Sequence, residues 1–197
     1  MPSIPPSKTD VDACRRCELW KRATQGVPGE GARRARLLLV GEQPGDEEDR
    51  QGKPFVGPAG RVLRGALAEA GIPGEDVFVT NAVKHFSWEP RGKRRIHKTP
   101  TQQQIAACID WLDAEIAAIR PRVIVTLGAT ALRAILAKKV AVGAARGEPL
   151  THASGTHVVA TWHPSAILRA PDDAGRPRLH ADLVADLKRS RELAQQS

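Results

Sequence analysis

RLLLVGEQPGDEEDRQGKPFVGPAG, residues Arg36–Gly60, is the segment that decides the fold of this chain. It begins with a short continuous apolar run, Leu37–Val40, which is typical of a strand buried on both faces of a parallel sheet. The run ends at Gly41 in a polar loop rich in glycine and proline. In open α/β sheets ligands bind beyond the carboxyl ends of the strands, so we expect a binding pocket at this loop.

The loop does not have the pattern of a phosphate-binding site. Six residues separate Gly45 from Gly52, where the Walker pattern has four, and Pro54 occupies the place of its Ser or Thr. The acidic run after Gly45 would also repel a polyphosphate. A carboxylate at Glu42, with an amide beside it and Phe55 nearby, suits a neutral, planar, hydrogen-bonding ligand such as a base. The alternative is an acidic loop that only starts a helix.

The whole chain has 197 residues, and we expect one domain over residues 1–197 with a flexible tail at residues 1–10. We find no apolar segment of membrane-spanning length and no signal-peptide pattern, so the sequence predicts a soluble, cytoplasmic protein, which we expect to be a monomer. The formal net charge is +8 and the pI is about 9.9, despite the acidic loop. This charge favours a polyanionic partner, although a basic composition alone also fits a protein that is merely soluble.

Further apolar segments alternate with helical patterns along the chain. Strands are expected at residues 77–80, 122–127 and 157–162, and helices at residues 58–70, 101–120, 129–137 and 177–194, with irregular structure at 138–156. Four strands separated by helices predict an α/β fold. We expect a three-layer α/β/α sandwich around a central, mainly parallel four-stranded sheet.

Polar residues stand at the carboxyl ends of three of the expected strands. Glu42, Asn81 and His163 occupy these places, so we expect them to converge on one edge of the sheet. Asn81 can offer both a donor and an acceptor to the edge of a base, although Asn is also a common turn residue.

The segment Lys84–Lys98, KHFSWEPRGKRRIHK, combines clustered cations with two aromatic residues. Lys93, Arg94 and Arg95 suit phosphate contacts, and the aromatic residues suit base stacking. The alternative is a flexible, solvated loop. His97 lies within the cationic run, where neighbouring positive charge favours the neutral imidazole, which is a nucleophile or base.

The chain has three cysteines, two of them in a Cys-x-x-Cys pair at Cys14 and Cys17, which is not the pattern of a secreted disulfide framework. Such a pair can be a redox pair, half a zinc site, half an iron–sulfur site, or two ordinary cysteines near a helix start. Cys108 lies on the apolar face of the helix expected at residues 101–120, where it can be a core residue.

Four motifs in this order resemble those of the uracil-DNA glycosylase superfamily, and more narrowly its fourth, iron–sulfur branch. The glutamine of the first motif and an insert at residues 93–97 are similar to the X branch of the same superfamily. Each motif alone is weak, but the ordered combination is specific and spans the chain from Cys14 to the last helix. The motifs are Gly41-Glu42-Gln43-Pro44-Gly45, Pro54-Phe55-Val56-Gly57, Thr80-Asn81-Ala82-Val83-Lys84 and His163-Pro164-Ser165, and the insert is Lys93-Arg94-Arg95-Ile96-His97.

The resemblance implies a three-layer α/β/α fold and, as the ligand, a uracil flipped out of DNA, with single-stranded DNA favoured. It assigns Phe55 to stacking on the base and Asn81 to the O4 and N3–H edge. It assigns His163 to O2, where negative charge grows as the base leaves. The remaining residues that it implies are Gln43, Gly45 and Asp46 in the pocket, and Ser165, Lys93, Arg94 and Arg95 on phosphates.

The resemblance also implies a 4Fe-4S cluster, for which relatives usually supply four cysteines. This chain has Cys14, Cys17 and Cys108, and His85 stands where the missing cysteine is expected. Imidazole can replace thiolate on iron, as it does in Rieske centres. Zinc at the same four residues and an incomplete site are the alternatives. We expect the cluster to be structural.

The reaction that the resemblance implies breaks the bond between uracil and its sugar, with His163 stabilising the uracil anion and Glu42 the sugar cation. His97 would then bond to C1′ while Glu42 holds its other N–H, and the protein would stay attached to DNA after one turnover. Two other functions remain open. One is a conventional, multi-turnover iron–sulfur glycosylase in which His97 only touches phosphate, and the other is a non-catalytic nucleic-acid-binding module.

Overall fold

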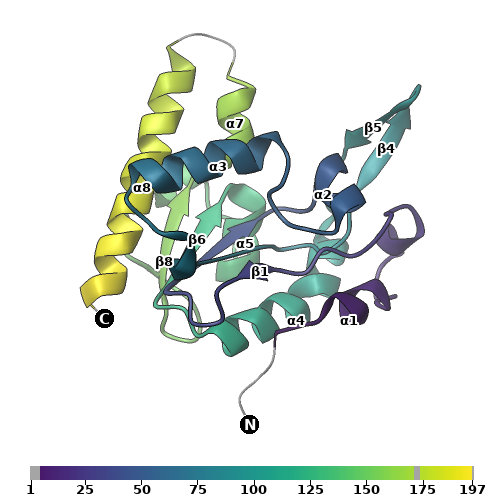
Figure 1. Ribbon diagram of the computed structural model, residues 1–197, viewed down its shortest axis with the longest axis horizontal. Helices are drawn as coiled ribbons and strands as arrows, with labels where there is room; N and C mark the ends of the chain where they lie inside the picture. Colours follow the sequence, from purple (N-terminus) through teal and green to yellow (C-terminus); the bar gives the residue numbers. More distant parts are fainter. Residues whose placement is uncertain (1–4, 171–173, 197) are drawn as a thin grey trace.

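A six-stranded sheet with the order β1-β3-β2-β6-β8-β7 forms the centre of the protein, whose computed structural model describes residues 5–170 and 174–196 (Figure 1). The four inner strands run parallel to one another, and the two short outer strands pair antiparallel at the edges. The predicted four-stranded parallel core is therefore confirmed. In spatial order the strands are β1 (Glu30–Gly31), β3 (Val77–Asn81), β2 (Leu37–Gly41), β6 (Val123–Leu127), β8 (His157–Thr161) and β7 (Leu150–Thr151).

Helices cover both faces of the sheet and complete the three layers (Figure 1). Helices α3 (Pro58–Glu69), α7 (Pro164–Leu168) and α8 (Gly175–Gln196) pack on one face, and α4 (Gln102–Ile119) and α5 (Ala129–Leu136) on the other. Alternate residues of β2 serve the two layers, Leu37 and Leu39 on the side of α3, Leu38 and Val40 on the side of α4. This two-sided burial is why the strand is a continuous apolar run. No helix in the described ranges is both long and apolar enough to cross a membrane.

Local signals set the helix ends much as the sequence predicts. Thr101 is the N-cap of α4, with its side chain accepting from the backbone N–H of Gln104 in a capping box. The helix ends at Ile119, and its C-cap Arg120 stands immediately before Pro121. A short 3₁₀ turn, η2 (Gly74–Asp76), leads from the end of α3 into β3.

A short helix begins within the segment where the sequence predicts a flexible tail, residues 1–10. Ser7 caps α1 (Lys8–Asp12) in a capping box with Asp10, and Val11 is fully buried. The box organises this segment, while residues 1–4 lie outside the described residues. A 3₁₀ turn, η1 (Glu18–Lys21), follows. The segment predicted as irregular, residues 138–156, also contains a short helix, α6 (Val142–Ala145), and β7.

The cationic segment is a β-hairpin that projects from the body of the molecule, beside α2 (Asp46–Gln51) (Figure 1). Strands β4 (Trp88–Arg91) and β5 (Arg94–His97) pair antiparallel, with Trp88 opposite His97. Gly92 opens the two-residue turn with a φ of 60°, as tight hairpin turns require. His97 therefore lies at the base of an ordered hairpin rather than in a solvated loop.

Candidate active site

The three polar residues expected at strand ends meet at one edge of the sheet. Glu42 follows β2, Asn81 ends β3, and His163 follows β8 as the N-cap of α7. Glu42 and His163 are near enough for the charge of each to shift the pKa of the other. The convergence at this edge is therefore present in the structure.

Phe55 closes the same corner from the segment between α2 and α3. Its ring stacks on that of His163 with the centroids 6.2 Å apart, and its backbone is left-handed, with a φ of 54°. A Cβ atom at residue 41 would lie 2.4 Å from Asn81 Oδ1 and 2.7 Å from the Phe55 ring. Phe55 and Asn81 can therefore approach each other only because residue 41 is glycine.

His163 is held as a neutral imidazole with a defined tautomer. Its Nδ1 accepts the backbone N–H of Ser165 at 3.1 Å and lies 2.8 Å from the Ser165 hydroxyl. Because Nδ1 is an acceptor, the proton is on Nε2. Burial lowers the pKa of His163 to about 4, and neighbouring Glu42 only partly opposes this. The ring can therefore donate one N–H bond, from Nε2, at neutral pH.

His97 lies against Glu42, with Nε2 3.1 Å from Glu42 Oε1. The second oxygen of Glu42 accepts a hydrogen bond from the Thr130 hydroxyl. Burial raises the pKa of Glu42, but the hydrogen bonds from His97 and Thr130 outweigh it, so the pKa lies below its ordinary value. Glu42 is thus an anion at neutral pH, able to accept an N–H of His97.

Gln43 holds the base of the hairpin through its side chain. Its Nε2 donates to the carbonyl oxygens of Ser87 at 3.0 Å and Lys98 at 3.2 Å, and its Oε1 accepts the N–H of Ser87 at 2.9 Å. The amide thus joins the residues just before and just after the hairpin. The resemblance implies a place in the pocket for the backbone at Gln43, which stays a prediction, while the side chain is engaged with the hairpin that carries His97.

Arg95 also fastens the hairpin, and this differs from its predicted role on phosphate. Its guanidinium pairs with Asp46 and with the fully buried Asp49, each at 2.5 Å. It also lies over the rings of Phe86 and Trp88, 5.4 and 5.5 Å from their centroids. The carboxylates of the acidic run attract this cation inward, whereas Lys93 and Arg94 are exposed at and beside the hairpin turn.

Three other groups predicted to contact ligand have partners within the protein. Asp46 is paired with Arg95 and Arg50, because it lies in the first turn of α2 facing the hairpin. The N–H of Gly45 donates to Glu48 Oε2. The hydroxyl of Ser165 lies on His163 Nδ1. These contacts organise the pocket walls, and the expected contacts of the three residues with uracil or DNA stay predictions.

The four predicted cluster ligands are gathered only in part. The thiols of Cys17 and Cys108 are hydrogen-bonded to each other, which lowers the pKa of Cys17 to about 6 and raises that of Cys108. Cys14 Sγ accepts from the indole N–H of Trp111, one turn beyond Cys108, at 3.4 Å. Burial lowers the pKa of His85. Within residues 5–170 and 174–196, no three His, Cys, Asp or Glu side chains form a group that could hold a metal ion.

The donor chemistry of these residues nevertheless fits an iron–sulfur cluster. One thiol with a lowered pKa, two further free thiols and a neutral imidazole are the ligand types such a cluster takes. Their assembly around a cluster stays a prediction.

Several residues that organise the site were missed in the sequence. Glu115 and Lys84 form a fully buried ion pair, 2.7 Å apart, and Lys84 Nζ also donates to the backbone oxygen of Asn81. The signal was present, because Glu115 falls on the apolar stripe of α4 between Leu112 and Ile116. Glu48 was also missed, and it accepts the N–H groups of Gly45 and Gly57.

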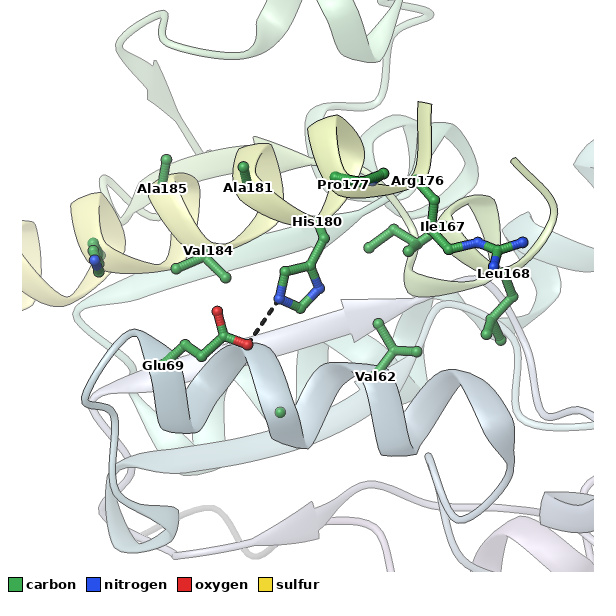
Figure 2. Close-up of a pocket in the computed structure, with 12 residues that line it drawn as sticks. Val62, Glu69, Ile167, Leu168, Arg176, Pro177, His180, Ala181, Val184 and Ala185 are labelled. Atoms are coloured by element: carbon green, nitrogen blue, oxygen red, sulfur yellow. Dashed lines mark hydrogen bonds and ion pairs between the residues drawn. The ribbon is translucent and has the colours of Figure 1, made fainter. Parts of the chain in front are cut away.

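An apolar groove with a volume of about 730 Å³ lies elsewhere, between α3, α7 and α8. Figure 2 shows His180 of α8 pointing across it to Glu69 of α3, at 2.9 Å, with Val62, Ile167 and Val184 around them. The converging polar residues are not part of its lining. The candidate site is therefore the strand-end corner and not this groove.

Comparisons with known proteins agree with the geometry. Residues 28–188 match the family described as the uracil DNA glycosylase superfamily. A Type-4 uracil-DNA glycosylase of Thermotoga maritima is 45% identical over 160 residues, which cover 81% of this chain and 80% of that protein. A Type-4 uracil-DNA glycosylase of Sulfurisphaera tokodaii is 36% identical over 202 residues, covering 98% of this chain and 86% of that protein.

A solved structure supports the fold alone. The solution NMR structure of a candidate uracil DNA glycosylase from Methanosarcina acetivorans matches with a TM-score of 0.50 at 14% identity. The match covers 85% of this chain and 98% of that one.

Proposed function

The chain belongs to the uracil-DNA glycosylase superfamily, and from this premise we propose that it excises uracil from DNA and then captures the sugar covalently through His97. The single observation that carries the proposal is the contact of His97 with Glu42, beside the corner formed by Phe55, Asn81 and His163. Relatives named as Type-4 glycosylases support excision, and the insert resembling the X branch supports capture.

Uracil recognition follows from the donors and acceptors of the corner. Asn81 can accept from N3–H and donate to O4, whereas cytosine presents the opposite pattern and leaves buried polar groups unpaired. Phe55 stacks on the base. The Nε2–H of His163 donates to O2, and this hydrogen bond strengthens as the leaving base becomes an anion.

Capture completes the reaction with its electrons balanced. The N1–C1′ bond breaks with its electron pair on uracil, and the sugar becomes an oxocarbenium ion beside the Glu42 carboxylate. The ring nitrogen of His97 that does not face Glu42 donates its lone pair to C1′. The imidazolium then shares or loses its remaining proton to Glu42, and the uracil anion takes a proton from water.

A 4Fe-4S cluster on Cys14, Cys17, His85 and Cys108 is part of the proposal. It would supply a structural tie between the start of the chain, the loop after β3 and α4. Lys93 and Arg94 are proposed to contact phosphates of single-stranded DNA, and residues 1–197 to act as one domain.

The test is a denaturing gel after mixing the protein with single-stranded DNA that contains one uracil. We expect a shift that survives heat and detergent, with peptide mass mapping of the adduct on His97. His97→Ser should abolish the shift but still release uracil, because water can then reach C1′. His163→Ala should slow uracil release itself, since the anion loses its donor.

The outcomes separate the competing functions. Abasic DNA without a shift, over many turnovers, would identify a conventional glycosylase. Binding without uracil release would identify a non-catalytic module. An adduct that persists in His97→Ser, or that maps to another residue, would contradict the assignment.

A further inference from the structure

Glu42 is held from two sides by side chains of different elements. Its Oε1 faces His97 Nε2 of the hairpin at 3.1 Å, and its Oε2 accepts from the hydroxyl of Thr130 in the first turn of α5. The Glu42 side chain is 22% exposed, and Thr130 is half-buried. The sequence drew no attention to Thr130, which lies 88 residues away along the chain.

The sheet fixes where Thr130 stands. Strands β2 and β6 are parallel neighbours with Val40 opposite Thr126, so the chain emerges from both strands at the same edge. Gly128 then turns the chain directly into α5 with a φ of 90°, a conformation that favours glycine. Thr130 is thereby brought over the carboxylate of Glu42 by backbone that belongs to the rigid core.

A carboxylate held by one partner can rotate about its terminal torsion, which is broad and roughly two-fold. A second hydrogen bond from a fixed hydroxyl removes that freedom and leaves the other oxygen aimed in one direction. Hydrogen bonds to charged groups are the stronger kind. The aim of Oε1 in turn decides which ring nitrogen of His97 carries the proton.

We propose that Thr130 is a positioning residue that orients Glu42, so that Oε1 holds the N–H of His97 and the other ring nitrogen of His97 keeps its lone pair toward the sugar. This inference rests on the proposed function and deepens it. Thr130 itself does not touch the reacting atoms; it acts through Glu42.

The experiment compares Thr130→Val, which keeps the shape of the side chain but lacks the hydroxyl, with Thr130→Ser, which keeps the hydroxyl. Both variants and the parent protein are mixed with single-stranded DNA containing one uracil, and uracil release and adduct formation are timed separately. We expect Thr130→Val to slow adduct formation by about ten- to a hundred-fold and to leave more free abasic product. Thr130→Ser should stay within about three-fold of the parent protein.

A second measurement needs no turnover. Imidazole ¹⁵N NMR of the DNA-free protein reports the His97 tautomer, and thermal unfolding shows that each variant is folded. We expect a single His97 tautomer in the parent protein and in Thr130→Ser, and a mixture of tautomers in Thr130→Val. A merely structural threonine would change the unfolding temperature without changing the tautomer.

The outcomes distinguish this inference from the proposed function. If the parent protein releases uracil but forms no adduct, the proposed covalent capture is wrong. The role of Thr130 is then tested by the rate of uracil release in the two variants, because Glu42 also assists that step. If the parent protein releases no uracil, the proposed function is wrong, and the His97 tautomer in the NMR experiment becomes the test of the role of Thr130. Equal behaviour of Thr130→Val and Thr130→Ser in the deciding measurement would overturn the inference.

Discussion

His163 shows how one buried side chain couples the site to the stability of the fold. Its ring is packed against Phe55, and its Nδ1 is committed to the N–H of Ser165. A proton on Nδ1 would break that hydrogen bond and place a charge in a buried corner. The neutral form is therefore the native form, and protonation must work against folding.

This predicts a specific loss of stability in acid. Burial lowers the pKa of His163 from an ordinary 6.5 to about 4, so as the pH falls the unfolded chain takes up this proton first. The contribution of neutral His163 to the unfolding free energy is complete above about pH 6.5 and is lost as the pH falls through about 4. The loss amounts to at most about 3 kcal/mol. Urea unfolding at pH 7 and pH 4.5 measures it.

The matched variant is His163→Gln, which cannot take up a proton. The pKa of Glu42 is also lowered, so its contribution to the unfolding free energy is lost in acid as well. Glu42 is present in both proteins, so the comparison isolates the contribution of His163. The drop in unfolding free energy between the two pH values should be smaller in His163→Gln. Equal drops would show that His163 titrates normally in the native state.

At the scale of elements, the β4–β5 hairpin is the part that carries His97. It is fixed to the body by the Gln43 amide at its base, by Arg95 on Asp46 and Asp49 along its length, and by the Trp88 indole on the backbone oxygen of Arg22. These contacts hold the hairpin against the body of the molecule, so that it presents His97 at one place. We expect the loss of one of these contacts to slow adduct formation at His97 more than it destabilises the hydrophobic core.

Gln43→Ala tests this directly. The change leaves the N–H of buried Ser87 and the carbonyl of Lys98 without their Gln43 partner, at a cost of about 1–3 kcal/mol. The Ser87 carbonyl keeps the backbone N–H of Lys98. We expect faster hydrogen exchange in residues 84–98 by mass spectrometry and slower adduct formation, with uracil release less affected. Gln102→Ala, an exposed glutamine in α4, is the control and should change neither. Unchanged exchange in Gln43→Ala would mean that the other contacts suffice.

At the scale of the whole molecule, the excess positive charge is not equally available to DNA. The formal charge is +8, yet Arg95 and Arg146 are each paired with two carboxylates, and Lys84 is buried with Glu115. Lys93 and Arg94, in contrast, are exposed on the projecting hairpin. Exposed cations such as Lys93 and Arg94, rather than the paired ones, should therefore contribute to the steering of a polyanion.

The salt dependence of binding to single-stranded DNA distinguishes the exposed cations Lys93 and Arg94 from the carboxylate-paired Arg95. Lys93→Ala and Arg94→Ala should each reduce the slope of log K against log salt by about 0.7, one phosphate contact each. Arg95→Gln should instead loosen the hairpin and lower adduct formation with little change in slope, because its charge already faces carboxylates. If Arg95→Gln reduces the slope as much as the others, its carboxylate pairing does not persist on DNA.

The proposed cluster predicts a brown protein with broad visible absorption and about four irons per chain. Cys108→Ala should lose the colour and the iron, whereas His85→Cys, which restores a four-cysteine set, should keep both. Absorption spectra and metal analysis measure this. A colourless protein holding one zinc per chain would contradict the prediction.

The sequence by itself determined the parallel core and the corner at its edge. Continuous apolar runs such as Leu37–Val40 can be buried only between two layers, and polar residues directly after such strands must meet where the strands end. Glu42, Asn81 and His163 were predictable for that reason. The start and end of α4 were equally local, because a Thr cap and a following Pro act on the nearest turn.

Only the tertiary structure decided which charges and amides are available. Arg95 and Lys93 lie in one basic run, but only Arg95 is paired with carboxylates. Its partners, Asp46 and Asp49, are more than forty residues away in the sequence. Gln43 binds Ser87 and Lys98, Thr130 binds Glu42, and Glu115 binds Lys84 across separations of 31 to 88 residues. A hydrogen bond forms only when the donor–acceptor distance falls within a range of a few tenths of an ångström. The spacing of two residues in the sequence does not determine that distance once the chain has folded back on itself.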